Sequence, residues 1–62
     1  MSHLINDMII ESIYEDIEEE LNQGTLSREI NEIAHNRNLH ADDHLDVILE
    51  IIAEERFESR SI

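Results

Sequence analysis

An apolar side chain recurs at every fourth position through the first third of the chain, and this spacing constrains the fold more than any other feature. Because 3.6 residues make one turn, side chains four apart lie on one face of an α-helix. We therefore predict a helix over residues 3–22, with Ser2 as its N-cap and Gly24, the only glycine, in the left-handed position that ends it. Its apolar face consists of Ile5, Ile9, Ile13, Ile17 and Leu21, widened by Ile10 and Tyr14.

A second, shorter helix is predicted over residues 26–37. Either Thr25 or Ser27 can cap its first turn, because both carry the hydroxyl that an exposed N–H needs. Asn36 and Asn38 then supply a turn, since asparagine tolerates left-handed backbone geometry. The apolar face of this helix consists of Leu26, Ile30, Ile33 and Ala34.

The third helix is predicted to open within residues 39–43, with His40 as N-cap and Leu39 as the hydrophobic residue that packs back on the first turn. Asp42 and Asp43 then face the positive end of the helix dipole. Residues 58–62 are expected to form a fraying tail. The core stripe consists of Ala41, Leu45, Ile48, Leu49 and Ile52. The chain is thus expected to be one all-α domain over residues 1–62, with a long, a short and a long helix.

A chain of 62 residues seldom buries enough apolar surface to fold without further support. It has no cysteine, which excludes disulfides and thiolate zinc sites. Apolar side chains outside the core stripes indicate a surface that a second copy or another protein covers. We therefore expect the three helices to assemble as a homodimeric bundle. The expected dimer or docking strip consists of Leu4, Met8, Val47 and Ile51.

Acidic residues outnumber basic ones by 16 to 4, which gives a net charge of −12. A polyanion repels phosphate backbones and anionic membrane surfaces, so direct binding to nucleic acid or to a membrane is not expected. No apolar run reaches the length of a membrane span, and the N-terminus lacks the basic and apolar regions of a signal peptide. We expect a cytoplasmic protein whose partner is cationic.

The carboxylates form two rows that face away from the apolar stripes. Residues four apart rise about 6 Å along a helix, whereas DNA presents a phosphate about every 3.4 Å per strand, so only rows on two helices or two subunits approach that spacing. The alternative is a solvated face that keeps the protein soluble, but the charge exceeds the magnitude of about 2–8 that solubility needs. Glu18, Glu19 and Glu20 also oppose the dipole at the end of the first helix, so we favour a partner-binding role for the rows. The rows are Asp7, Glu11, Glu15 and Glu18 in the first helix, and Asp43, Asp46, Glu50 and Glu54 in the third.

Short motifs typical of metal sites are present, but their surroundings argue against that chemistry. His40 and His44 have zincin-like spacing, but Ala41 stands where the catalytic glutamate belongs. Glu32 and His35 match the Glu-x-x-His of di-iron bundles but project away from the second apolar face, and a metal-dependent dimer built on them stays an alternative. The second and third helices have the outline of a helix-turn-helix, but DNA binding in that mode would bring aspartates close to the phosphates, which repel them. Without a nucleophile or phosphate-loop motif, we expect no enzymatic activity, cofactor or metal.

In its small size, lack of cysteine, scarcity of glycine and helical acidity, the whole chain resembles the small early proteins of bacteriophages. These include DNA-mimic inhibitors, which occupy the nucleic-acid groove of a host enzyme. The resemblance therefore implies an inhibitor or regulator that sets its acidic rows in a basic groove of a larger protein in the bacterial cytoplasm. The alternative is a helix-docking adaptor that binds through the apolar strip of Val47 and Ile51.

Overall fold

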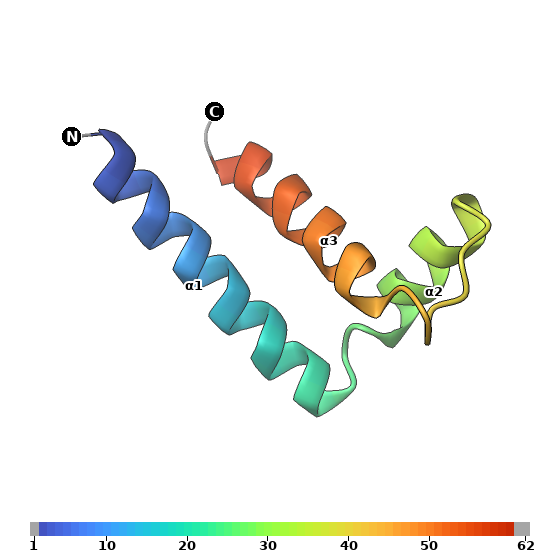
Figure 1. Cartoon of the computed structure of the whole chain (residues 1–62). Helices are drawn as coiled ribbons and strands as arrows, with labels where there is room; N and C mark the ends of the chain where they lie inside the picture. Colours follow the sequence, from blue (N-terminus) through green and yellow to red (C-terminus); the bar gives the residue numbers. More distant parts are fainter. Residues whose placement is uncertain (1, 61–62) are drawn as a thin grey trace.

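The computed structural model describes the backbone from Ser2 to Arg60 and the side chains from Asp7 to Arg60. Within this part of the chain, three helices and no strand are formed: α1 (Ser2–Gln23), α2 (Ser27–Asn36) and α3 (Leu45–Arg60). The two long helices lie side by side and antiparallel, and α2 packs against α3 (Figure 1). The predicted all-α order of long, short and long helix is confirmed. Among the described residues, none of the helices combines the length and the hydrophobicity that a membrane-spanning segment needs.

Gly24 ends α1, as predicted. Its φ of 78° is left-handed, and the Thr25 N–H donates to the Glu20 carbonyl at 3.0 Å, as in a Schellman motif. The Thr25 hydroxyl donates to the same carbonyl and the Ser27 hydroxyl to that of Gly24, both at 3.2 Å. The prediction that Thr25 or Ser27 caps α2 is therefore wrong, because both hydroxyls serve the turn before it. Leu26 stands at the N-cap position and makes no side-chain cap.

The start of α3 differs most from the prediction. Asn38 follows the end of α2 with a φ of 54°, the left-handed geometry expected of it. The chain then makes a separate turn, in which the N–H groups of Asp43 and His44 both donate to the His40 carbonyl at 3.1 Å. Because α3 begins only at Leu45, the placement of His40 as its cap and of the following aspartates in its first turn is wrong.

The buried core draws on all three helices and on the α1–α2 turn. Leu39 and Ala41, in the connection before α3, are half-buried against it. Packing of this connection on the core explains the delayed start of α3, since tertiary contacts override local helix signals. Ile10 and Tyr14, predicted to widen the apolar face of α1, stay exposed. The core consists of Ile13, Ile17, Leu26, Ile30, Ala34, Ile48, Ile52 and Ala53, and only Ala53 lies outside the predicted stripes.

The last turn of α3 falls partly in the predicted tail. Helical geometry continues to Arg60, and residues 61 and 62 lie outside the described part of the chain. The fraying of residues 58–62 stays a prediction. Ser2, predicted as the N-cap of the first helix, lies at the first position of α1, and its side chain is outside the described residues.

Candidate functional site

One side of the α1–α3 pair is closed by ion pairs. Arg56 on α3 donates two hydrogen bonds of 2.8 Å to the Glu20 carboxylate on α1, and it lies 3.9 Å from Glu29 on α2. One turn later, Arg60 lies 3.3 Å from Asp16 on α1. These five residues are termed the clasp. It joins all three helices through charged groups at the surface.

The clasp also changes the pKa values of Glu20 and Arg56. The hydrogen bonds from Arg56 lower the pKa of Glu20, while desolvation opposes the shift. The same bonds raise the pKa of Arg56, so both groups are charged at neutral pH. The sequence assigned Glu20 to a repulsive acidic cluster at the end of the first helix. That assignment is wrong for Glu20, because Arg56 approaches it from 36 positions away in the chain.

The opposite side of the pair is hollowed and apolar. On α1, Tyr14 and Asp16 are two positions apart, which separates their directions by about 200° around the helix axis. Tyr14 therefore points away from the clasp, and a surface hollow of about 370 Å³ lies beside it between the two helices. This hollow is termed the groove. Its lining consists of Ile10, Ile13, Tyr14, Ala53, Glu54, Phe57 and Glu58.

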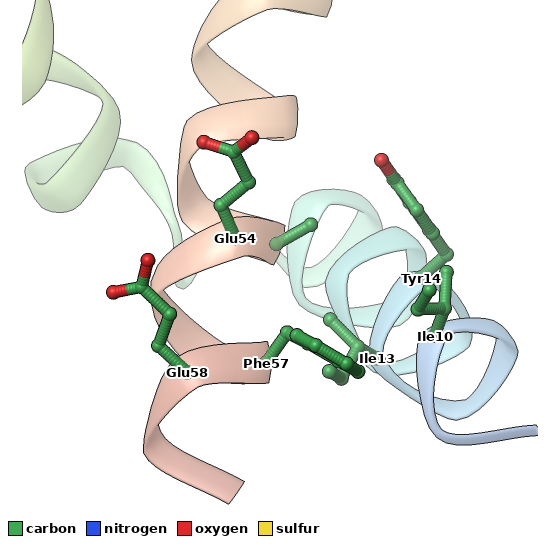
Figure 2. A pocket seen from close by; sticks show the side chains of 7 residues that line it. Ile10, Ile13, Tyr14, Glu54, Phe57 and Glu58 are labelled. Atoms are coloured by element: carbon green, nitrogen blue, oxygen red, sulfur yellow. The ribbon is translucent and has the colours of Figure 1, made fainter. Parts of the chain in front are cut away.

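The groove has an apolar floor and a polar edge. Figure 2 shows the Phe57 ring extending from α3 toward Ile13 on α1, with Glu54 of α3 and Tyr14 of α1 both above the ring in this view. Ile10 is 38% exposed and Tyr14 44% exposed, although each is a large apolar side chain next to the core. The sequence pattern did not indicate that Phe57 lines a surface groove. The only sign of a special role was that Phe57 is an aromatic residue just before the predicted fraying tail.

Both acidic rows reach the edges of this groove. On α1, Glu11 and Glu18 lie three and four residues from Tyr14, and residues at these spacings are neighbours on a helix surface. On α3, Glu54 lines the groove itself, and Glu50 precedes it by one turn. All eight predicted row carboxylates are exposed, and none takes part in an ion pair among the described residues. Asp43 lies in the turn before α3, so its predicted position in the helical row is wrong.

The predicted dimer or docking strip is divided in the structure. Met8 is 63% exposed near the start of α1, and Val47 is 41% exposed near the start of α3. Because the two helices run antiparallel, these residues lie at opposite ends of the pair (Figure 1). Ile51 is half-buried one turn after Val47, and the side chain of Leu4 lies outside the described residues. Homodimer formation stays a prediction.

The residues of the two short motifs that resemble metal sites lie on exposed surface. Glu32 and His35 are both exposed on α2, and His40 and His44 are exposed in the connection before α3. Among the described residues, no group of three His, Asp or Glu side chains could hold a metal ion.

Comparison with known proteins adds no relative. No protein-family model matches the chain, and no curated protein or solved structure matches it.

Proposed function

We propose that this protein is an interaction protein that sets its acidic rows against a basic surface of a larger protein and thereby inhibits or regulates it. The observation that carries the proposal is the separation of charge between the two sides of the α1–α3 pair. Arg56 and Arg60 are the only arginine or lysine residues in the sequences of these two helices, and both lie in the clasp. Among the described residues, no carboxylate of the rows forms an ion pair.

Charge neutralisation of the rows must therefore come from outside the described chain. In the free protein, salt ions supply it, and a cationic partner would release those ions on binding. Exposed carboxylates at the edge of an interface attract a cationic partner and make the rate and strength of its binding depend on salt. In the clasp, arginines lie beside carboxylates and stabilise the fold. Because the rows have no such arginines, a partner-binding role explains them better than a merely solvated face.

A DNA-mimic form of this proposal follows from the arrangement of the rows. Adjacent packed helices have axes about 8–10 Å apart, and the carboxylates on each helix rise by about 6 Å per turn. Rows on antiparallel α1 and α3 together present anions more densely than one helix does. The proposed target is thus a surface that normally holds a phosphate backbone, with the acidic rows in place of the phosphates.

The proposal is tested by affinity capture from a bacterial lysate followed by elution in a salt gradient. A row variant and a matched control, each with three exposed carboxylates neutralised, are compared with the wild type. We expect the wild type and the control to retain a basic protein that elutes as salt rises, and the row variant to lose it. Equal capture by all three proteins, or a complex that withstands molar salt, would contradict the proposal. The row variant carries Glu11→Gln, Glu18→Gln and Glu50→Gln, and the control carries Glu32→Gln, Asp42→Asn and Glu55→Gln.

A second candidate function is a helix-docking adaptor. It is supported by Val47, which is 41% exposed and stands one turn from the half-buried Ile51 on α3. Val47→Asp would abolish partner binding of this kind, whereas the row variant would not affect it. Binding would also vary little with salt, because burial of apolar surface drives it.

A further inference from the structure

We propose that the groove binds one amphipathic basic helix of the partner, which inserts an apolar side chain between Tyr14 and Phe57 and sets Lys or Arg side chains along both acidic edges. This inference rests on the proposed function and specifies the chemistry of the partner segment. The observation behind it is that one apolar hollow separates the two uncompensated acidic rows.

The floor of the groove requires an apolar ligand. Its lining is mainly aliphatic and aromatic, and Ile10 and Tyr14 remain more than a third exposed in the free protein. Covering such side chains removes apolar area from water, which favours binding. Only two helices wall the hollow, so a free small molecule would stay largely in solvent. A side chain held in place by its own backbone fits this geometry better.

The edges of the groove require basic residues beside that apolar side chain. Glu11 and Glu18 flank Tyr14 on α1, while Glu50 and Glu54 follow the α3 edge. A ligand that covers the floor must pass between these carboxylates. Lys or Arg on both flanks of its apolar stripe would pair with them, whereas acidic flanks would be repelled.

The groove side of the α1–α3 pair has room for a helix. Arg56 lies 3.9 Å from Glu29 of α2, so α2 meets the pair on the clasp side. The residues that line the groove come from α1 and α3. A third helix can pack in the groove between two antiparallel helices. It contacts the groove through its side chains at i, i+3, i+4 and i+7. An amphipathic helix of the partner therefore fits both the shape and the charge of this side.

A second copy of the chain does not fit the groove by its charge. Two copies would each bring a net charge of −12. Docking groove against groove would oppose row to row, because both arginines of α3 are engaged on the far side in the clasp. Like charges brought together in this way cost free energy.

Three synthetic peptides of equal length test this inference by isothermal titration calorimetry. The first is a helix with leucine at i, i+3, i+4 and i+7 and lysine on both flanks. The second replaces the leucines with serine, and the third replaces the lysines with glutamate. We expect the first to bind at least about tenfold tighter than the second, because burial of one leucine side chain is enough for that difference, and the third not to bind. Quenching or enhancement of Tyr14 fluorescence should accompany binding of the first, since Tyr14 is the only tyrosine and the chain has no tryptophan.

Single substitutions locate the binding surface. Ile10→Ser should weaken binding of the leucine–lysine peptide about tenfold, while Val47→Ser should leave it unchanged, although both residues are about 40% exposed on long helices. Glu54→Gln should weaken it more than Glu32→Gln, which neutralises an exposed carboxylate on α2. Circular dichroism of each variant confirms that the helices are retained.

The outcomes separate this inference from the proposed function. Equal binding of the leucine and serine peptides, lost in the row variant, would overturn the groove inference and leave the acidic rows as the binding surface. Binding of neither peptide would count against both. Sedimentation showing a dimer that Ile10→Ser dissociates would assign the groove to a second copy and overturn the inference. Tight binding of the leucine–glutamate peptide would overturn it too, because charge would then play no part.

Discussion

The clasp and the groove lie on opposite sides of the same two helices and treat the same kind of residue in opposite ways. On the clasp side, Asp16 and Glu20 meet arginines at 3.3 and 2.8 Å. On the groove side, Glu11 and Glu18 meet no cation of the described chain. One side therefore uses carboxylates to hold the helices together, and the other exposes them around an apolar surface.

This difference teaches that the role of a carboxylate here depends on its direction around the helix. A shift of two positions along α1 moves a side chain about 200° around the axis, which is enough to separate Asp16 from the groove at Tyr14. The arginines of α3 lie four residues apart and so serve one side only. Composition alone assigns all the acidic residues to one class, whereas the fold divides them.

The largest expected effect comes from a substitution in the hydrophobic core that the clasp side and the groove side share. Ile52 is fully buried on α3, one turn before Arg56 and next to Ala53 of the groove. Ile52→Ala should lower the free energy of unfolding by about 2–5 kcal/mol. This is a large share of the total of about 3–9 kcal/mol expected for a chain of this size. Urea denaturation followed by circular dichroism measures the loss. Val47→Ala is the control, and an equal loss in both variants would show that Ile52 does not carry the core.

The end of α1 and the identity of the core could be predicted from the sequence because their causes are local. Gly24 marks a position that needs positive φ, and its observed φ is 78°. Asn38 gave the same signal after α2, with an observed φ of 54°. The four-residue spacing of isoleucine located the buried face of α1, including Ile13 and Ile17. Each of these signals lies within one or two turns of the residue it determines.

The groove and the clasp could not be predicted in this way, because both depend on how α1 and α3 are aligned. Glu20 and Arg56 are 36 positions apart, and no local pattern states that they meet. Phe57 faces Ile10 and Tyr14 only through the same alignment. The sequence therefore identified most of the acidic residues at the groove edges but not the apolar surface between them.

The next effect concerns the clasp. Arg56→Met should lower the free energy of unfolding by about 1–2 kcal/mol, because it leaves Glu20 and Glu29 facing each other without the two charged hydrogen bonds. Arg28→Met removes the same charge from an exposed position on α2, where the arginine forms no ion pair among the described residues, and should change stability by less than about 0.5 kcal/mol. Thermal melts of the two variants compare them directly. Equal melting temperatures would remove the clasp as a stabilising element.

A smaller effect appears in the pH dependence of the clasp. The folded pKa of Glu20 lies below its ordinary value of 4.5. Its contribution to stability is therefore complete above that value and is lost as pH falls through the folded pKa. Glu20→Gln should cost about 0.5–1 kcal/mol at pH 7, after allowance for solvent screening, and the difference from the wild type should vanish in strong acid. Glu54→Gln, on the groove side, should show no such loss at pH 7. A Glu20→Gln deficit that persists unchanged in strong acid would contradict this account.

The smallest expected effect is the dependence of folding stability on salt, to which the clasp and the rows contribute with opposite signs. Added sodium chloride screens the attraction in the clasp and the repulsion among the rows at once, and a net charge of −12 makes repulsion the larger of the two. Raising salt to several hundred millimolar should therefore stabilise the wild type by a few tenths of a kcal/mol. Arg56→Met should gain more than the wild type from the same salt, because only repulsion is left to screen around Glu20 and Glu29. Melting curves at low and high salt measure both gains. If salt destabilised the wild type, attraction in the clasp would outweigh repulsion in the rows, and the rows would no longer count as charge that the fold leaves uncompensated.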